Sequence, residues 1–377
     1  WNSNKQSCPI PPYRYHHYFP MVGLSSALYL LSLFKMSQNK IITIGTHDGT
    51  FHCDEALAIF LLKLLPRYKD GIIVRSRDPD VLNSCDIVVD VGGKYDPSTH
   101  RYDHHMRDFN ESLSTIIHED GCNSKIKLSS AGLIYCHFGH EIIKQLAPVN
   151  TSDDIIKIIF NSVYYKLIQE IDAIDNGIPM FDQEPAYKIL TGISSRVDRL
   201  NPSWNDENTN DNIQFLKAID LVGEEFNYVV HNCINVWLPA RYIVENAVAN
   251  RFQIDESGEI IELEKFTPWQ QHLMDIEKEK NIKPLIKYVI FKDIKTEYRV
   301  RAIPVKPSSF ICRMFLPEKW GGLRTKELEA VNGISGSIFV HSVRFIGGHK
   351  TREGALEMAR KALEIGKNEQ IKLKENK

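Results

Sequence analysis

Residues 40–65, KIITIGTHDGTFHCDEALAIFLLKLL, decide the fold of this 377-residue chain. The segment begins with KIITIG, a short run rich in β-branched residues, which predicts a buried strand. A polar loop, THDGTFHCDE, follows directly. The dense apolar run Ala56–Leu65 then predicts a helix, which Pro66 ends. A strand, a polar loop and a helix in this order predict the first unit of an α/β fold.

The segments that follow repeat this alternation. Two further apolar runs, GIIVRSR at 71–77 and DIVVDV at 86–91, predict two more strands. Residues 128–146 and 155–172 carry apolar side chains at helical spacing. Because strands that alternate with helices usually form parallel sheets, we expect a largely parallel sheet in residues 40–200.

The composition changes near residues 198–213, DRLNPSWNDENTNDNI, which predicts a linker or a long loop. We expect residues 201–250 to form a helical connection and the β-rich residues 251–366 to form a smaller α/β domain. The elements expected there are a hairpin around Ser257-Gly258, strands in 287–305 and at 337–345, a helix at 351–365, and a frayed, charged tail at 367–377.

Residues 1–39 are expected to be an extension outside this fold. Their apolar run, MVGLSSALYLLSLF at 21–34, is shorter than the roughly 20 residues that a transmembrane helix needs. It resembles the apolar part of a signal or transit segment. Met36 is a plausible start, so residues 1–35 are explained equally well as a native targeting segment or as dispensable upstream material.

The overall charge excludes one class of protein. With 46 basic and 48 acidic residues the formal net charge is −2, so the chain is not a globally basic nucleic-acid binder. A polyanion would have to meet a local basic patch, with metal ions offsetting the acidic centre. The seven cysteines form no CxxC pair, which argues against a disulfide framework and against a structural zinc site.

Histidines and aspartates gather where the predicted elements end. Open parallel sheets bind ligands at the carboxyl ends of their strands, so side chains that follow different strands can meet there. Mixed His and Asp ligands without thiolates favour Mn²⁺, Mg²⁺ or Fe²⁺ over structural Zn²⁺. Two such ions, about 3.5–4 Å apart, could share a carboxylate and activate water. The candidate residues are His47, His52, Asp54, Asp90, Asp103, His104, His105, Asp172 and Asp175.

Each of these residues taken singly has an ordinary explanation. Asp54 can stabilise the N-terminus of the helix that follows it, and Asp103 can close an Asx-turn. The convergence of several separated segments on one edge of the sheet is what favours a metal site.

Four motifs, TIGTHDGTFHCDEA, DIVVDVGG, RYDHH and EIDAIDNG, are similar to the successive motifs of the DHH phosphoesterase superfamily, and most closely to its Myg exonuclease branch. The resemblance extends from about residue 40 to the C-terminal helix. It implies a DHH-type parallel-sheet catalytic domain and a smaller α/β C-terminal substrate-binding domain. His52 departs from the superfamily pattern in two ways. The pattern usually has an aspartate at this position, and it has one residue fewer before that aspartate.

The resemblance also implies roles for the candidate residues and two divalent cations, with Mn²⁺ preferred over Mg²⁺. Asp90 matches the bridging carboxylate, His105 would lie near the scissile phosphate as a proton donor or charge stabiliser, and Asp103 would orient an imidazole. Asp172 is preferred as a ligand, with Asp175 as the competing candidate. One ion is expected on His47, His52 and Asp90, and the other on Asp54, Asp90, His104 and Asp172.

A second polar segment, RFIGGHKTR at 344–352, predicts a turn from a strand to a helix. Its two glycines allow an anion close to the backbone, and the helix that follows directs free N–H groups at the same point. An ordinary turn with solvated basic residues explains the segment equally well. Because DHH enzymes carry a GGGH-like turn in the C-terminal domain, the resemblance favours substrate binding by Gly347, Gly348, His349, Lys350, Arg324 and Arg344.

The expected function is metal-dependent hydrolysis of phosphodiester bonds. The resemblance implies a 3′→5′ exonuclease acting on RNA in the mitochondrion or nucleus, with the cytoplasm also open, and the near-neutral charge favours short or single-stranded RNA. One alternative is a small-molecule phosphoesterase, such as a pyrophosphatase or a cyclic-dinucleotide hydrolase. The other is a non-catalytic, metal-stabilised RNA-binding module. No membrane partner is expected, and the sequence does not predict the oligomeric state.

Overall fold

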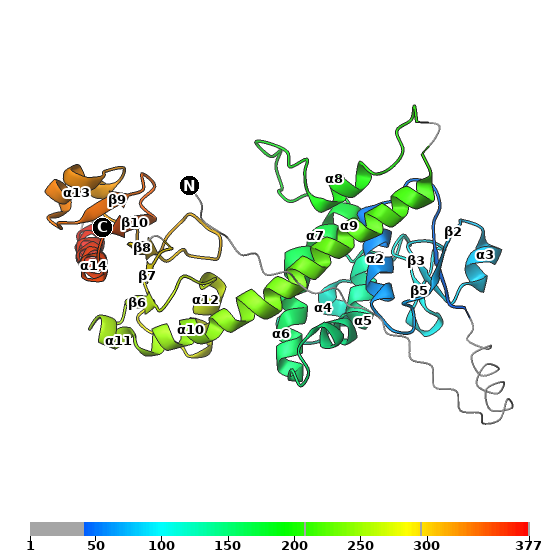
Figure 1. The fold of residues 1–377 in the computed structure, drawn as a ribbon, viewed down its shortest axis with the longest axis horizontal. Helices are drawn as coiled ribbons and strands as arrows, with labels where there is room; N and C mark the ends of the chain where they lie inside the picture. Colours follow the sequence, from blue (N-terminus) through cyan, green and yellow to red (C-terminus); the bar gives the residue numbers. More distant parts are fainter. Residues whose placement is uncertain (1–40, 207–208, 295, 376–377) are drawn as a thin grey trace, which may run out of the picture.

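The computed structural model describes residues 41–206, 209–294 and 296–375. Two five-stranded sheets lie in separate halves of the chain and are joined by one long helical run (Figure 1). Residues 43–102 build the first sheet and residues 260–349 the second. The expected N-terminal extension, residues 1–39, lies outside the described residues.

The first sheet is largely parallel, as the alternation of strands and helices predicts. Strands β2, β1, β3 and β5 run parallel, and β4 pairs antiparallel with β5 at the edge. The carboxyl ends of β1, β3 and β5 therefore lie at the same edge of the sheet. The strands are β1 (Thr43–Thr46), β2 (Ile72–Arg75), β3 (Ile87–Val89), β4 (Tyr95–Asp96) and β5 (Arg101–Tyr102).

Most of the helices between residues 53 and 232 pack with this sheet around one core, and the short helix Pro79–Ser84 packs through Leu82 in a smaller cluster with Cys85 and Val88. Leu57, Ile134, Phe160 and Phe226 are fully buried members of that core. The helices are α2 (Cys53–Lys63), α3 (Pro79–Ser84), α4 (Leu113–Ile116), α5 (Ser130–Leu146), α6 (Asp153–Val163), α7 (Gln169–Asp175), α8 (Ile193–Asp198) and α9 (Asp211–Asn232), with a 3₁₀ turn at Pro97–Thr99 and a π-helical turn, η2 (Tyr164–Ile168), between α6 and α7.

The connection between the two sheets is helical, as predicted. Helix α9 continues through a π-helical turn, η3 (Cys233–Trp237), into α10 (Leu238–Ala249). Phe215 of α9 is buried in the core of the first sheet, whereas Val244 of α10 is buried in a core formed with the second sheet. The run therefore belongs to both cores.

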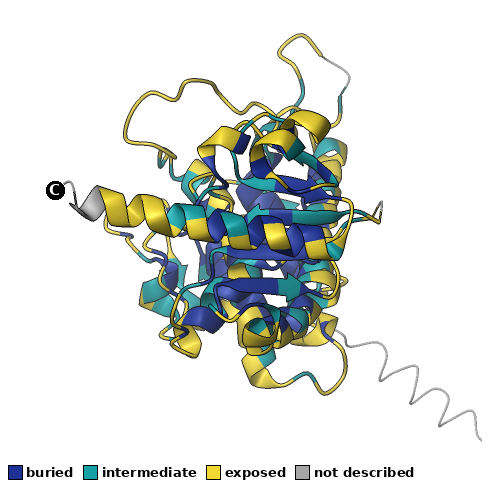
Figure 2. Ribbon diagram, turned by 90° about the vertical axis from the view of Figure 1, so that its left-hand side faces the viewer, coloured by how far each residue is buried: buried dark blue, intermediate teal, exposed yellow. Residues whose placement is uncertain are grey.

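The second sheet is mixed. Strands β6 and β7 pair parallel, and the remaining neighbours in the order β6-β7-β8-β10-β9 pair antiparallel. Figure 2 shows the long helix α14 lying across this half of the molecule, with buried residues on its inner side and exposed residues toward its end. The elements are α11 (Arg251–Ile254), β6 (Ile260–Leu263), α12 (Gln270–Glu279), β7 (Tyr288–Lys292), β8 (Tyr298–Ala302), a 3₁₀ turn at Glu318–Trp320, α13 (Thr325–Asn332), β9 (Ser337–Val340), β10 (Ile346–His349) and α14 (Arg352–Glu375).

Three sequence predictions in this half are wrong. The expected hairpin around Ser257-Gly258 is instead a turn between helix α11 and strand β6, because residues 251–254 add one more helical turn after α10. The strand expected at 337–345 ends at Val340, and residues 341–345 form the turn before the next strand. The tail expected to be frayed from residue 367 continues α14 as far as Glu375.

None of the helices in the described part of the chain combines the length and the apolarity that crossing a membrane requires.

Candidate metal centre

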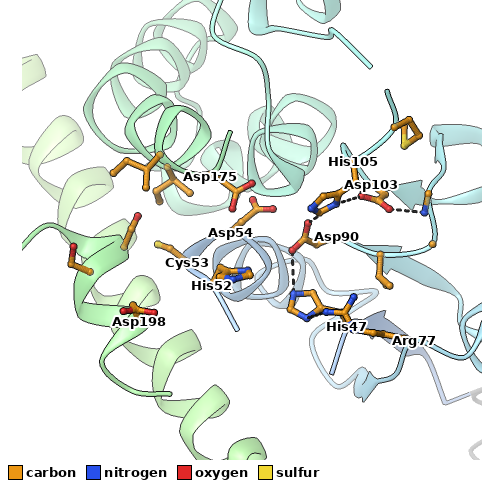
Figure 3. A pocket seen from close by; sticks show the side chains of 18 residues that line it. His47, His52, Cys53, Asp54, Arg77, Asp90, Asp103, His105, Asp175 and Asp198 are labelled. Atoms are coloured by element: carbon orange, nitrogen blue, oxygen red, sulfur yellow. Dashed lines mark hydrogen bonds and ion pairs between the residues drawn. The ribbon is translucent and has the colours of Figure 1, made fainter. Parts of the chain in front are cut away.

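A cavity of about 640 Å³ opens at the carboxyl ends of β1, β3 and β5 (Figure 3). The described residues that line it all fall between positions 47 and 198, so no described residue of the second sheet contributes to the lining. The predicted site residues that line the cavity are His47, His52, Asp54, Asp90, Asp103, His105 and Asp175.

Asp90 lies between two buried histidines at the end of β3. One carboxylate oxygen is 3.4 Å from Nε2 of His47, and the other is 3.3 Å from Nε2 of His104. Asp90 takes a left-handed backbone conformation, with φ of 60°, which Asp and Asn adopt more readily than most residues. Burial alone would raise the pKa of Asp90, but its hydrogen bonds with the two histidines outweigh burial and lower the pKa. The geometry suits a carboxylate shared by two cations.

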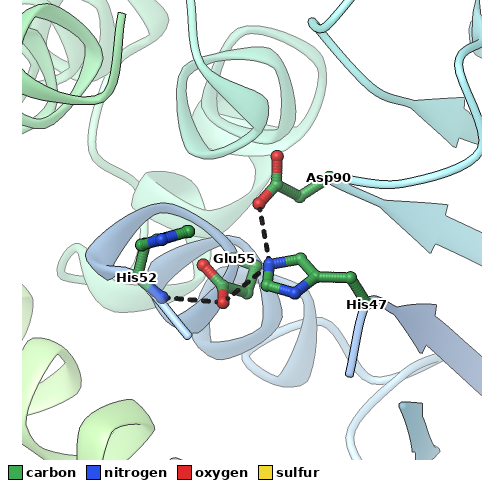
Figure 4. A group of neighbouring side chains, drawn as sticks. All are labelled: His47, His52, Glu55 and Asp90. Atoms are coloured by element: carbon green, nitrogen blue, oxygen red, sulfur yellow. Dashed lines mark hydrogen bonds and ion pairs between the residues drawn. The ribbon is translucent and has the colours of Figure 1, made fainter. Parts of the chain in front are cut away.

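The first group of ligands surrounds His47 (Figure 4). It comprises His47, His52, Glu55 and Asp90, whose ligand atoms lie within 4.8 Å of one another. Oε1 of Glu55 is 3.0 Å from Nε2 of His47 and accepts a hydrogen bond from the His52 backbone N–H at 2.8 Å. Oε2 of Glu55 is buried and has no hydrogen-bond partner among the described residues. A buried carboxylate oxygen without a partner fits a bound cation.

The second group lies on the other side of Asp90. It comprises Asp54, His104 and Asp175, again with ligand atoms within 4.8 Å of one another. Nε2 of His104 is buried and faces three carboxylates: an oxygen of Asp175 lies 3.0 Å away, one of Asp90 lies 3.3 Å away and one of Asp54 lies 3.8 Å away. Nδ1 of His104 lies 3.2 Å from the side-chain oxygen of Asn176, a contact that fixes Nε2 as the ligand atom.

The N-terminus of α5 holds Asp54 in place. Its carboxylate accepts hydrogen bonds from the backbone N–H groups of Ser130 at 3.0 Å and Ala131 at 2.6 Å, and from the hydroxyl of Ser129 at 2.5 Å. Burial, followed by the negative charges of Asp175 and Asp90, raises the pKa of Asp54. A nearby cation would reverse this effect and favour the ionised carboxylate.

His105 faces the cavity and rests on Asp103. Its Nδ1 is 2.7 Å from Oδ1 of Asp103, while its side chain is 61% exposed. The other oxygen of Asp103 accepts a hydrogen bond from the Gly93 N–H at 2.6 Å. The hydrogen bond to Asp103 raises the pKa of His105. Asp103 thus joins the His105 imidazole to the backbone at Gly93, and its role in orienting an imidazole stays a prediction.

The preference for Asp172 over Asp175 as a ligand is not supported. Asp172 is fully buried outside the cavity lining, where Oδ1 accepts hydrogen bonds from the backbone N–H and the hydroxyl of Ser129, and Oδ2 accepts one from the Tyr164 hydroxyl. A Cβ at Gly132 would lie 2.2 Å from this carboxylate, so Asp172 packs directly against the backbone of α5. Asp175, at the end of α7, reaches the cavity instead.

Two residues of this site are absent from the sequence-based assignment. Glu55 stands next to Asp54 in the first turn of α2, where a glutamate is usually explained as part of a capping box. Asn176 is the C-cap residue of α7 and directly follows Asp175. Both residues stand in the quoted motifs, beside residues that were assigned as ligands.

The glycine-rich segment of the second sheet differs from the prediction. Gly347 and Gly348 lie within strand β10 rather than in a turn, because the reversal of the chain occurs earlier, at 341–345. His349 is buried, with Nε2 2.9 Å from the Ser335 carbonyl oxygen and Nδ1 accepting from the Thr351 N–H. Its ring nitrogens are thus already used within the fold.

The basic residues predicted beside that segment lie on the second half of the molecule. Lys350 and Arg324 are exposed, and Arg324 lies over the Phe339 ring. Arg344 lies over the Phe315 ring. None of them belongs to the described lining of the cavity, so their role in substrate binding stays a prediction.

Binding of divalent cations is expected to release protons. Burial would lower the pKa of His47 and of His104, but hydrogen bonds to Asp90 from both, to Glu55 from His47 and to Asp175 from His104 raise these pKa values to about 10 and about 11. Both imidazoles are therefore protonated at pH 7.5 without metal, and a cation must displace those protons. Titration of metal-free protein with MnCl₂, by calorimetry in two buffers of different ionisation enthalpy, should show release of about two protons. Apparent affinities that do not rise between pH 6.5 and 8.5 would contradict this expectation.

The chain is similar to known proteins over most of its length. A MYG1 exonuclease family model, described as "Uncharacterised protein family (UPF0160)", matches residues 43–363. The MYG1 exonuclease of Homo sapiens is 50% identical over 334 residues, covering 87% of this chain and 88% of that protein. A MYG1 protein of Caenorhabditis elegans is 48% identical over 333 residues, covering 87% and 97%. The crystal structure of RecJ in complex with Mn²⁺ from Thermus thermophilus has a TM-score of 0.25 at 11% identity, covering 89% of this chain and 54% of that chain, a similarity too distant to inform function.

Proposed function

Because this chain belongs to the MYG1 exonuclease family, we propose that it is a metal-dependent phosphodiester hydrolase, and more specifically a 3′→5′ exonuclease acting on short or single-stranded RNA. The family membership confirms the resemblance seen in the sequence motifs. The observation that carries the proposal is the position of Asp90 between His47 and His104, each of which belongs to its own group of ligands. Such an arrangement is what two neighbouring cations require.

Two divalent cations would be held by residues of this chain alone. When bound, they would lower the pKa of water and offset the charge that develops on the phosphate. The mixture of imidazole and carboxylate ligands supports Mn²⁺ over Mg²⁺, because Mg²⁺ prefers oxygen ligands. The proposed ligands are His47, His52, Glu55 and Asp90 for one cation, and Asp54, His104 and Asp175 for the other, which Asp90 would share through the oxygen that lies 3.3 Å from His104.

Two further side chains support phosphodiester chemistry in this cavity. His105 is exposed to it and is held by Asp103, so we assign it the donation of a proton to the leaving oxygen. Arg77 is the one lysine or arginine among the described lining residues, and we assign it a contact with a substrate phosphate. Both assignments place a cationic group where an anionic substrate enters.

The remaining parts of the proposal concern substrate and location. We propose that the half of the chain containing the second sheet, residues 251–366, binds the RNA, with Lys350, Arg324 and Arg344 as its contributors of positive charge. Lys350 and Arg324 are exposed, as such contacts require. Action in the mitochondrion, the nucleus or both is part of the same proposal, with the cytoplasm as the other compartment.

The experiment is hydrolysis of a substrate panel by metal-stripped protein to which MnCl₂ or MgCl₂ is added back. The panel contains single-stranded RNA labelled at either end, the matching DNA and duplex RNA, pyrophosphate and a cyclic dinucleotide. We expect Mn²⁺-dependent release of mononucleotides from the 3′ end of single-stranded RNA. Hydrolysis confined to pyrophosphate or the cyclic dinucleotide would contradict the exonuclease function and support a small-molecule phosphoesterase. Retention of RNA without hydrolysis of any substrate would favour a non-catalytic binding module.

A further inference from the structure

Arg75 lies behind the loop that carries His47. It is the last residue of β2, and it does not belong to the described lining of the metal cavity. Its Nε donates to the His47 carbonyl oxygen at 3.3 Å, and its Nη2 donates to the Gly49 carbonyl oxygen at 2.5 Å. One guanidinium group therefore fixes the backbone on both sides of Asp48, directly where the His47 side chain leaves the sheet.

The same guanidinium is itself held by aromatic and polar groups. It lies 4.6 Å from the ring centroid of Phe215 on α9 and 5.7 Å from that of Phe51. Its Nη1 donates to the Asn212 side-chain oxygen, also on α9, at 3.3 Å. These contacts leave the guanidinium little freedom to turn away from the two carbonyl groups.

The far end of the loop is fixed as well. The side chain of Asn201 accepts a hydrogen bond from the Phe51 N–H at 2.9 Å and donates to the Phe51 carbonyl oxygen at 2.8 Å. The loop from His47 to Phe51 is therefore anchored at both ends, and Arg75 is the anchor nearer to the ligand. Because a shift of a few tenths of an ångström changes a metal site, this anchor bears directly on the cation held by His47.

The charge of Arg75 has no direct counter-ion. Burial lowers its pKa, and the charges of Glu55, Asp211 and Asp48 act in the opposite direction without forming a direct ion pair in the described structure. No direct ion pair explains an arginine here, whereas its hydrogen bonds to the His47 and Gly49 carbonyl oxygens do. Arg67 makes a useful contrast, because it also lies against two aromatic rings, those of Tyr68 and Phe138, but is paired with Glu141.

We propose that Arg75 is a positioning residue for the metal centre: by fixing the carbonyl groups of His47 and Gly49, it directs the His47 imidazole toward Asp90 and Glu55. This inference rests on the proposed use of metal by the site. It assigns Arg75 no contact with substrate or with the cation. Its effect is confined to the cation held by His47, because Asp54, His104 and Asp175 make no contact with the Arg75 side chain in the described structure.

The test is titration of metal-free wild-type, Arg75→Lys and Arg75→Gln proteins with MnCl₂, followed by electron paramagnetic resonance of free and bound Mn²⁺. A lysine keeps the charge but cannot span two carbonyl groups and stack on a ring at once. We expect the wild-type protein to bind two ions. In both variants the affinity for one ion should fall by about tenfold or more, while the affinity for the other ion stays unchanged. Arg67→Lys, the matched control, should bind both ions as the wild type does.

Three other outcomes of this titration would contradict either the positioning role of Arg75 or the proposed function. Wild-type affinity for both ions in Arg75→Lys and Arg75→Gln would overturn the positioning role while leaving the proposed function intact. Equal weakening of both ions, together with a lower thermal unfolding temperature than Arg67→Lys, would show that Arg75 acts on the whole fold and would likewise overturn it. Failure of the wild type to bind Mn²⁺ or to hydrolyse any substrate would instead remove the proposed function on which the inference rests.

Discussion

Replacing Asp90 with asparagine is expected to lower the rate of phosphodiester hydrolysis by about 10³-fold. The carboxylate stands between the two groups of ligands, 3.4 Å from His47 and 3.3 Å from His104, so its neutral amide would weaken both cations at once. The rate is measured with saturating MnCl₂ on the labelled RNA that the wild-type protein degrades. Binding of Mn²⁺ should weaken in parallel.

The Asp90→Asn substitution leaves the backbone conformation at this position unstrained. Asp90 has a φ of 60°, and asparagine tolerates this left-handed conformation as well as aspartate does, whereas alanine would be strained there. Backbone strain should therefore not lower the thermal unfolding temperature of metal-free protein, and any fall should come from the lost charge of Asp90 beside His47 and His104. Asp78→Asn is a matched control, since Asp78 caps helix α3 outside the described cavity lining and asparagine caps equally well. A wild-type rate in Asp90→Asn would exclude a bridging role.

The second large effect is expected from a matched pair of alanine substitutions on helix α7. Asp175→Ala should reduce hydrolysis by about 10²-fold or more, because it removes a ligand of the cation near His104, and should lower the free energy of unfolding less than Asp172→Ala does. Asp172→Ala should instead destabilise the protein by about 3 kcal/mol. It leaves two buried donors without an acceptor, the N–H of Ser129 and the hydroxyl of Tyr164, whereas the hydroxyl of Ser129 keeps Asp54 as its acceptor.

The pair separates a ligand from a structural carboxylate on one helix. Urea unfolding of metal-free protein gives the change in stability, and MnCl₂ titration gives the change in affinity. Loss of Mn²⁺ affinity in Asp172→Ala, with unchanged affinity in Asp175→Ala, would restore the assignment that the motif favoured. The same result would require α7 to turn when metal binds.

The sequence was sufficient to predict those site residues that lie directly at the ends of strands. His47 and Asp90 each directly follow a parallel strand, so the topology alone brings them together. The sequence could not distinguish Asp172 from Asp175 as the ligand, because the distinction depends on how closely α7 packs against Gly132 of α5. Packing between helices that are distant in sequence leaves no local pattern.

The turn before β10 is a second feature that the sequence does not predict. Its alternating residues, HSVRF at 341–345, contain no Gly, Pro or Asn to indicate a reversal of the chain. Arg344 nevertheless adopts a φ of 64°, the conformation that such turns usually assign to glycine. Because this turn was missed, Gly347 and Gly348 were expected to form the reversal themselves, whereas they lie in a strand.

The helical run from Asp211 to Ala249 constrains the mechanics of the molecule. At about 1.5 Å per residue it is a lever roughly 60 Å long, with one end set in each core. A long helix bends most readily where its hydrogen-bond ladder is interrupted, and this one is interrupted at the π-helical turn Cys233–Trp237. An approach of the second sheet to the cavity would be a swing about that point, and α10, about 18 Å long, would turn a bend of about 10° into about 3 Å of travel at its tip.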